Sequence, residues 1–431
     1  MNILVAGATG FIASQIVTDL LLDGHQVTCA VRNVSYAQKL FPNAKVIPCD
    51  FIHDVDGATW LPRLENIDVI VNCVGVLYHP NKKIIWNIHY ATPKALFDAA
   101  EQSGVQRIIQ ISALGCDKNS VDYATSKKAA EDYLLSLPIK SVILRPSLVY
   151  GRGSYGGTSL FRGLTGLPWL LPVPGNGEQR FQPIYLPDLS KAVKNLITIP
   201  LTESVVLSAV SSTQKTLTQV LTTLRSWLGF SKAKLISIPL IFIRLGAFFG
   251  DFIPYSAMNT SSYKMLVQNN ITTEQETKRF HEMIGFIPRD LEAGIYTEPS
   301  TVQDHWHARL FFLKPFLQLS IGVVWLFGGI CSLFFSQQAA YHWLTALGIN
   351  SVWQPTLLYG ASLLDILIGF AVLFNYKTYK IGILQLLILI GYTFIITCKL
   401  PVLWLDPFGA IVKNLPFMVA ILVYLALGSD R

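Results

Sequence analysis

The first 150 residues alternate short apolar runs with amphipathic stretches, and the two patterns predict different elements. A short continuous apolar run is typical of a strand buried on both faces of a parallel sheet, whereas apolar positions three or four apart are typical of a helix. The predicted strands are residues 2–6, 26–31, 45–50, 68–75, 107–112 and 141–146. Strands separated by helices in this rhythm predict an α/β fold with a doubly wound parallel sheet.

A glycine-rich turn follows the first predicted strand and opens the first predicted helix. Gly7 permits the tight reversal of the chain, Gly10 lets the backbone approach a pyrophosphate, and Ala13 lets the helix pack closely on the strand. The phosphates would lie at the positive end of the helix, next to its backbone N–H groups. The turn therefore predicts a dinucleotide site, to which we assign Gly7, Thr9, Gly10, Phe11 and Ile12.

Residues that follow the later strands indicate which dinucleotide binds. Arg32 follows the second strand, where an NAD site has a carboxylate for the ribose 2′-hydroxyl and an NADP site has arginine for the 2′-phosphate. We therefore expect NADP(H) rather than NAD, with a solvated loop arginine as the alternative. Asp50 would accept a hydrogen bond from the adenine amino group, and Gly75 would let the backbone run beneath the dinucleotide. Val74 and Pro146, also at strand ends, complete the predicted cofactor site.

Tyr123 and Lys127 lie four residues apart at the start of a predicted helix, a spacing that places both side chains on one helix face. A phenol has a pKa of about 10, and an adjacent ammonium and a nicotinamide cation lower it. We predict that Tyr123 transfers a proton, that Lys127 lowers its pKa and binds the ribose hydroxyls, and that Ser112 hydrogen-bonds the substrate oxygen. A surface tyrosine beside a solvated lysine is the structural alternative.

Together these motifs resemble the extended and atypical short-chain dehydrogenase/reductases. The likeness covers about residues 1–230 and rests on Gly7-x-x-Gly10-x-x-Ala13, Asn72-x-x-Gly75, Ser112, Tyr123-x-x-x-Lys127, Arg145-Pro146 and Val149-Tyr150-Gly151. The segment 112–115 and its short spacing to Tyr123 are similar to the branch that contains the nucleotide-binding accessory subunit of respiratory complex I. The resemblance implies a Rossmann fold with Ser112, Tyr123 and Lys127 as catalytic residues. Ala113 stands where extended enzymes usually have a second Ser or Thr, and the accessory-subunit relatives bind NADPH without evident turnover.

Two segments after the sheet have unusual compositions. Residues 155–182 are rich in glycine and proline, which is typical of a flexible cover over a substrate site. Within it, Arg162, Arg180 and Gln182 are candidates to bind an anionic substrate group, with solvated loop side chains as the alternative. Residues 235–254 are very apolar but are interrupted by proline and charged residues. We expect an interfacial or substrate-pocket helix there rather than a membrane span.

The composition changes after residue 310. Hydrophobic residues make up 51% of the chain and charged residues 14%, but only nine charged residues fall among the last 121. Four apolar stretches in this part approach the roughly 20 residues of one hydrocarbon crossing. They are 316–335, 356–374, 381–398 and, the weakest, 410–428. The sequence thus predicts an NAD(P)-binding domain (1–230), a substrate-side or interfacial region (231–310) and an all-α four-helix transmembrane domain (311–431).

The C-terminal part resembles the DoxX-like four-helix membrane domain over about residues 310–428. Lys314-Pro315, Leu403-Trp404 and the segment 407–416 carry the likeness. Asp365 lies in the middle of the second apolar stretch, where a charge would cost at least ~2.5 kcal/mol. We expect it to be protonated or paired, and the candidate partners are Lys399, Asp406 and Lys413. A functional site for a quinone, a proton or a lipid headgroup is the alternative.

Basic residues at the ends of the apolar stretches predict their orientation. Arg309 and Lys314 precede the first stretch, and Lys377 and Lys380 lie between the second and third, whereas residues 336–355 contain neither lysine nor arginine. This asymmetry favours cytoplasmic amino and carboxyl termini in a bacterial-type inner membrane. The predicted nucleotide domain would then face cytosolic NADPH.

We therefore expect a membrane-anchored NADP(H)-dependent oxidoreductase that acts on a carbonyl or alcohol of a hydrophobic or lipid-like substrate, quinones included. One alternative is a non-catalytic NADPH-binding assembly or structural protein of a membrane complex. Another is an enzyme like the sugar-nucleotide epimerases and dehydratases, which Arg32 disfavours. The six cysteines lack metal-ligand spacing, so we expect no metal site. A net charge of +7 without a basic run argues against nucleic acid as a partner.

Overall fold

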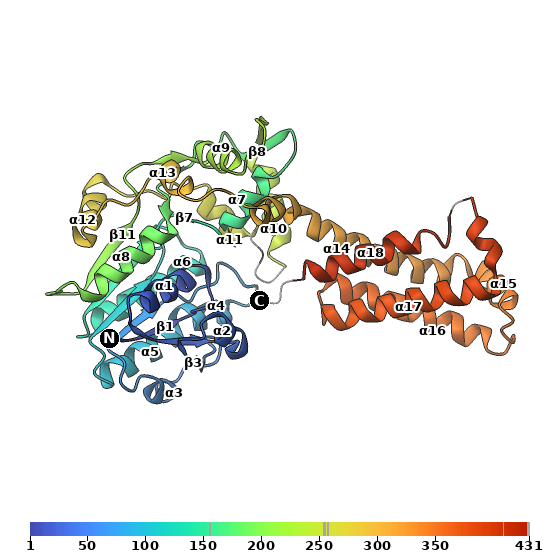
Figure 1. Ribbon diagram of the computed structural model, residues 1–431, viewed down its shortest axis with the longest axis horizontal. Helices are drawn as coiled ribbons and strands as arrows, with labels where there is room; N and C mark the ends of the chain where they lie inside the picture. The colour runs from blue at the N-terminus through green and yellow to red at the C-terminus, as the bar shows by residue number, and fades with distance from the viewer. Residues whose placement is uncertain (155–156, 253–255, 257, 408, 429–431) are drawn as a thin grey trace. The chain divides into compact units, whose positions relative to one another are not determined.

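The computed structural model describes residues 1–154, 157–252, 256, 258–407 and 409–428 of the chain. The chain divides into two compact units, Met1–Ala308 and Arg309–Arg431, and each unit has its own hydrophobic core. All the described strands lie in the first unit, whereas the described residues of the second unit form helices, turns and loops (Figure 1).

The main sheet of the first unit is parallel throughout, with the strand order β11-β6-β5-β4-β1-β2-β3. Its strands are β1 Asn2–Ala6, β2 Gln26–Val31, β3 Lys45–Pro48, β4 Val69–Asn72, β5 Arg107–Ile111, β6 Ser141–Pro146 and β11 Val205–Ala209. Six of them match the predicted runs, which confirms the doubly wound α/β fold. Because β1 lies between β2 and β4, the strand order reverses between β1 and β4, and ligands of such sheets bind at this switch point.

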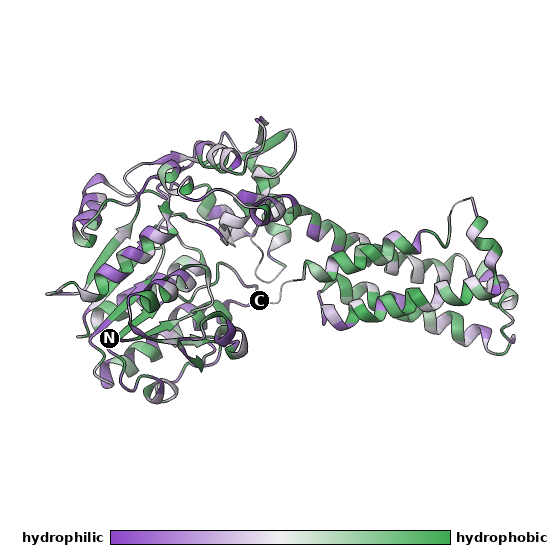
Figure 2. Ribbon diagram, in the orientation of Figure 1, coloured by the Kyte–Doolittle hydropathy of each residue, from purple (hydrophilic) through white to green (hydrophobic). Residues whose placement is uncertain are grey.

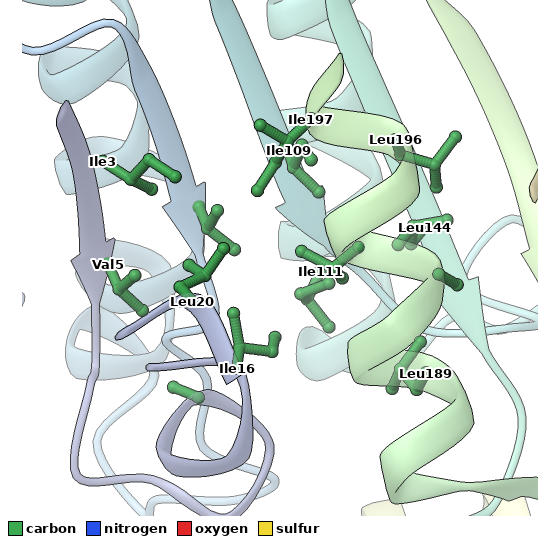
Figure 3. Close-up of a cluster of buried hydrophobic side chains, with 14 of the residues drawn as sticks. Ile3, Val5, Ile16, Leu20, Ile109, Ile111, Leu144, Leu189, Leu196 and Ile197 are labelled. Atoms are coloured by element: carbon green, nitrogen blue, oxygen red, sulfur yellow. The ribbon is translucent and has the colours of Figure 1, made fainter. Parts of the chain in front are cut away.

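Helices cover both faces of the sheet because successive side chains of a strand point to opposite faces. In β1, Ile3 and Val5 pack in one buried cluster, and Leu4 and Ala6 pack in the other. Figure 3 shows the first cluster, in which side chains of α1 and α8 lie against the strands. The helices of this first face are α1 Phe11–Leu22, α2 Val34–Leu40, α8 Leu186–Thr198 and α12 Glu274–Ile284; those of the second are α3 Gly57–Trp60, α5 Thr92–Gln102 and α6 Asp122–Ser136.

The rest of the first unit forms a smaller subdomain with its own core, built from three short strand pairs and several helices. The pairs are β7 Val149–Tyr150 with β10 Ile184–Tyr185, β9 Arg180–Phe181 with β12 Lys215–Thr216, and β8 Leu170–Pro174 with β13 Lys234–Ile238. The remaining helices of the first unit are η1 Leu61–Arg63, α4 Lys82–Trp86, the π-helix η2 Asn87–Ala91, α7 Gly157–Thr165, α9 Leu217–Trp227, α10 Leu240–Gly250, α11 Thr260–Leu266 and α13 Leu291–Ile295.

Two of the three predicted anion-binding candidates have internal partners instead. Arg162 is buried, forms an ion pair of 3.2 Å with Asp304 and donates to the Ser154 carbonyl. Gln182 is buried and donates from its amide to the Ser211 carbonyl. Both side chains therefore hold the subdomain together, because a buried polar group needs a partner, and only Arg180 is exposed.

Among the residues that the structure describes, three helices are long and apolar enough to cross a membrane: α14 Val302–Phe334, α16 Gln354–Leu373 and α17 Thr378–Lys399. Between and after them lie α15 Gln337–Ala346, η3 Pro401–Leu405 and α18 Asn414–Ala426. Figure 2 shows that these helices are predominantly apolar along their length. The fourth predicted stretch, 410–428, forms the shorter α18, whose 13 residues extend only ~20 Å. Pro416 lies in the first turn of α18, where proline is best tolerated, and so favours a helix that begins at Asn414.

A polar layer crosses the core of the second unit. Trp325 Nε1 donates to Gln385 Oε1 at 2.8 Å, and both side chains are buried. In the neighbouring α16, Asp365 Oδ1 is buried without a hydrogen-bond partner among the described residues. None of the ion pairs in this described part of the chain joins Asp365 to Lys399 or Lys413, so the predicted pairing with either lysine is not present.

We predict that Asp365→Asn stabilises the second unit. An amide is less costly to bury than an unpartnered carboxylate, so the free energy of unfolding should rise by about 2 kcal/mol. The measurement is the melting temperature of the full chain in detergent or nanodiscs. Lys380→Gln, which removes an exposed charge at the start of α17, is the matched control and should change nothing. A lower melting temperature for Asp365→Asn would contradict the prediction.

Candidate functional site

The glycine turn between β1 and α1 has the geometry that a nucleotide phosphate requires. Gly7 has a φ of +74°, and a Cβ at this position would lie 3.0 Å from Val74 Cγ2. Gly10 is the N-cap of α1 and, as a glycine, provides no side-chain cap. Phe11 and Ile12 begin the helix, and Thr9 lies in the turn itself. A glycine turn directly before a helix is the arrangement in which a phosphate binds at a helix N-terminus, and the phosphate site predicted here stays a prediction.

Two buried amide side chains hold the end of β4 in place. Asn72 Nδ2 donates to Gln110 Oε1 of the neighbouring β5 at 2.8 Å, and Asn72 Oδ1 accepts from the backbone N–H of Val74. Gly75 follows, and a Cβ there would lie 3.3 Å from Lys127 Nζ. Because a larger residue would push against the lysine, Gly75 allows the backbone after β4 to pack closely against Lys127. Its position beneath a dinucleotide stays a prediction.

The remaining predicted cofactor residues lie at three other strand ends. Arg32 is exposed directly after β2. Asp50 follows β3, where its carboxylate accepts from the Ile52 backbone N–H at 3.0 Å and lies 2.8 Å from His53 Nδ1. Pro146 ends β6 and is buried, and its carbonyl accepts from the Leu114 backbone N–H. Of these three, Arg32 has the most freely accessible side chain.

Tyr123 and Lys127 occupy one face of α6, as their spacing predicts. The Lys127 ammonium lies 5.7 Å from the centroid of the Tyr123 ring and donates to the Ile111 carbonyl at 3.1 Å. Burial lowers the pKa of Lys127, and it raises the pKa of Tyr123 above its ordinary value, since both charged forms lose solvation. The phenol of Tyr123 is therefore protonated at neutral pH.

His89 is a residue of this site that the sequence analysis missed. It lies in the π-helix η2, where its Nε2 accepts from the Val76 backbone N–H and its Nδ1 lies 2.9 Å from Ser126 Oγ. This pairing leaves the proton on Nδ1, and burial beside Lys127 keeps the pKa of His89 well below its ordinary value. The neutral ring meets the Tyr123 ring edge to face at 5.3 Å and so fixes the phenol. π-Helices frequently lie at functional sites, but no simple sequence pattern predicts one, so the sequence did not indicate His89.

A second buried network lies behind the predicted catalytic serine. Ser112 Oγ is 3.8 Å from Cys116 Sγ, which in turn donates to Glu131 Oε1. Glu131 forms a two-oxygen pair with Arg145, and Arg145 also reaches Asp117. These hydrogen bonds and nearby anions hold the pKa of Arg145 above its ordinary value, despite its burial. These hydrogen bonds and ion pairs hold in place the residues around a cavity beside Tyr123.

This cavity has a volume of about 610 Å³, within the range of small-molecule sites. Tyr123 and Arg145 line it, together with residues of the β5–α6 loop such as Ala113. Its opposite side comes from α11 and the segment that follows it, and includes Met265 and Asn270. The cavity therefore depends on the packing of segments that are distant in sequence, as the hydrogen bond from Asn270 Nδ2 to the Leu114 carbonyl, 156 residues away, illustrates.

No group of three or more His, Cys, Asp or Glu side chains in the described ranges has the arrangement of a metal site. The six cysteines are free thiols. The candidate site consists of Tyr, Lys, Ser and His side chains and of the glycine turn.

Comparison with known proteins agrees with this geometry. The NAD(P)H-binding family matches residues 7–159, and the DoxX-like family matches residues 322–422. The chain is 28% identical over 198 residues to NADH dehydrogenase (ubiquinone) 1 alpha subcomplex subunit 9, mitochondrial, of Arabidopsis thaliana, a match that covers 44% of this chain and 48% of that protein. It is 26% identical over 238 residues to the ceramide reductase of Caulobacter vibrioides, covering 54% of this chain and 73% of the reductase.

Among solved structures, MoeE5 in complex with UDP-glucuronic acid and NAD shares the fold, with a TM-score of 0.53 and 18% identity, over 69% of this chain and 97% of that chain. The chain spans about half the length of the mitochondrial subunit that it matches. The chain thus has a Rossmann-like fold in a region that is similar to the NAD(P)H-binding family and to complex I subunit 9, followed by a region that is similar to the DoxX-like family.

We predict that Glu131→Gln destabilises the first unit. The change leaves Arg145 without its buried counter-charge, which should cost about 3 kcal/mol, measured as a fall in the melting temperature of the full chain. Asp132→Asn is the matched control, because the adjacent Asp132 pairs with Lys128 at the surface and its loss should cost no more than about 0.5 kcal/mol. Equal effects of the two substitutions would contradict the prediction.

Proposed function

We propose that this protein is a membrane-bound NADP(H)-dependent oxidoreductase that interconverts a carbonyl and an alcohol on a hydrophobic substrate. The observation that carries the proposal is the position of Tyr123, which lines the cavity while Lys127 lies behind it, beside Gly75. This arrangement brings a proton donor, a fixed positive charge and an open nucleotide edge to one place.

In the reductive direction, Tyr123 Oη donates its proton to the substrate oxygen as that oxygen gains negative charge. Lys127 stabilises the phenolate left on Tyr123, because its ammonium stands 5.7 Å from the ring in a buried site. Ser112, next to the lining residue Ala113, would hydrogen-bond the same oxygen. NAD(P)H, when bound along the Gly7 turn, supplies the hydride. His89 holds the phenol ring in place through its edge-to-face contact.

Arg32 supports NADP(H) over NAD. Its guanidinium is exposed at the end of β2, where the 2′-phosphate of the adenosine ribose would lie, and Asp50 at the neighbouring strand end is occupied by local hydrogen bonds. A guanidinium binds a phosphate through two parallel hydrogen bonds, whereas it cannot form this two-bond contact with a single hydroxyl.

The membrane location is part of the same proposal. Lys314, Lys377 and Lys380 flank the apolar helices on one side, with Lys399 and Lys413 on the other as a partial exception. This asymmetry would place both termini in the cytoplasm of a bacterial-type cell. NADPH is then available to the first unit. The similarity to ceramide reductase supports a reductase that works on a lipid-like molecule.

The similarity to a complex I subunit supports a second candidate function, an assembly or structural role in which the nucleotide is held and not turned over. The two functions differ in what happens to the nucleotide. A structural role requires NADPH that co-purifies, does not exchange and accompanies a partner complex, whereas an enzyme must release and rebind it.

We predict that Tyr123→Phe abolishes turnover and leaves nucleotide binding intact. Loss of a general acid lowers rates by about 10²- to 10⁴-fold, but the hydroxyl is not needed to hold the dinucleotide. The measurement is NADPH oxidation by the full chain in lipid vesicles, with mass spectrometry of the bound nucleotide in parallel. Tyr133→Phe, on the same helix but hydrogen-bonded to Asp98, is the matched control. Unchanged turnover in Tyr123→Phe would rule out the assignment.

We also predict that Arg32→Ala weakens NADPH binding selectively. Loss of the phosphate contact should raise the Kd for NADPH by about 30-fold and leave the Kd for NADH unchanged. Titration of both nucleotides against the full chain measures this, with the exposed Lys39 on α2 changed to Ala as the control. Equal losses for the two nucleotides would show that Arg32 does not read the 2′-phosphate.

A further inference from the structure

Helix α10 in the first unit has one buried face and one bare apolar face. The buried face is formed by small residues: Ala247 is 1% exposed, and a Cβ at Gly246 would lie 3.0 Å from Met258 Sδ. The opposite face carries large apolar residues that are more than half exposed, with spacings of one helical face. They are Ile241, Phe242, Leu245, Phe248, Phe249 and, just after the helix, Phe252.

Further apolar side chains are exposed on the strand pair that leads into α10. Trp169 is 81% exposed, and its carbonyl accepts from the Lys234 backbone N–H at the start of β13. Leu170 and Leu235 are also exposed. Several large apolar side chains exposed on one helix face mark an interaction site, whereas single exposed apolar residues do not.

Charge around this surface is basic. Lys232, Lys234 and Arg244 are exposed on the same segment. The nearby carboxylate, Asp251, is occupied, because it accepts from the backbone N–H of Thr260 at 2.8 Å and from the Thr260 hydroxyl. Exposed aromatic and aliphatic side chains rimmed by lysine and arginine are what an anionic lipid surface attracts.

The same helix reaches the candidate active site. Tyr78, three residues after Gly75, donates from its hydroxyl to the Asp251 carbonyl at 2.8 Å. On the other side, Asp251 holds the start of α11, and Met265 of α11 lines the cavity. The residue that follows α10 therefore connects the helix to the segment after Gly75 and to α11, which contributes a residue to the cavity wall.

We propose that α10 is an interfacial helix that docks on the bilayer and that the adjoining cavity admits lipid-like molecules from it. The eleven residues of α10 extend ~16 Å, too short to span, so the helix would lie in the plane of the headgroups. A bilayer is the occupant that the observations favour, because the same chain carries three helices able to cross one and the rim of the bare face is basic. The substrate class rests on the proposed function, and the docking does not.

The docking is tested by photo-crosslinking of the full chain in phosphatidylcholine–phosphatidylglycerol vesicles. A benzophenone amino acid replaces Phe249, and the control replaces Leu22, which is 79% exposed at the end of α1. We expect about tenfold more lipid adduct at Phe249 than at Leu22, falling when Arg244→Glu is added or phosphatidylglycerol is omitted. Crosslinks from Phe249 to residues 309–431, to a second copy or to another protein, or adducts equal to the control, would overturn the docking.

The substrate class is tested by binding and not by turnover, so that its failure is distinct from failure of the proposed enzyme activity. A long-chain ketone with a diazirine, dissolved in the same vesicles, should label residues 113–124 or 265–279, which line the cavity. The double substitution Phe248→Ser and Phe249→Ser should reduce this labelling about fivefold, since docking is lost, and leave NADPH binding unchanged. Labelling outside the cavity segments, or unaffected by the substitutions, would overturn the assignment of a lipid-like ligand.

Discussion

The close approach of two strand ends is the constraint on which the rest of the site depends. Because β1 and β4 are neighbours in the sheet, the Gly7 turn meets Val74 with no room for a side chain. One residue later, Gly75 lies against the Lys127 ammonium under the same restriction. Two positions without side chains thus let the chain pack closely at the switch point of the sheet, where ligands of such sheets bind.

Helix α6 connects this edge to the cavity. Tyr123, Lys127 and Glu131 are spaced four residues apart, so all three lie on one face and point into the unit. Each is restrained by a different partner: Tyr123 by the His89 ring, Lys127 by a backbone carbonyl and Glu131 by Arg145. Burial of these groups costs free energy, and their hydrogen bonds offset part of it, which makes the face rigid as well as reactive. Preorganised groups of this kind suit proton transfer.

The two units bury their apolar side chains in different ways. In the first unit, apolar side chains alternate between two cores on either side of the sheet. In the second unit, long helices are predominantly apolar, and polar contacts such as that between Trp325 and Gln385 connect neighbouring helices. Helix α10 combines the two patterns, because one of its faces packs on protein and the other is exposed. This exposed apolar face is the surface that we propose to dock on a membrane.

Local patterns in the sequence were enough to predict the sheet, the glycine turn, the Tyr123–Lys127 pair and the membrane helices, because strand and helix periodicity is encoded by neighbouring residues. The sequence did not predict His89, the Glu131–Arg145 pair or the internal roles of Arg162 and Gln182, because their partners are distant in the chain. The cavity and the bare face of α10 likewise depend on how segments pack. A period along the chain determines which face of an element is apolar, but only tertiary packing decides what covers that face.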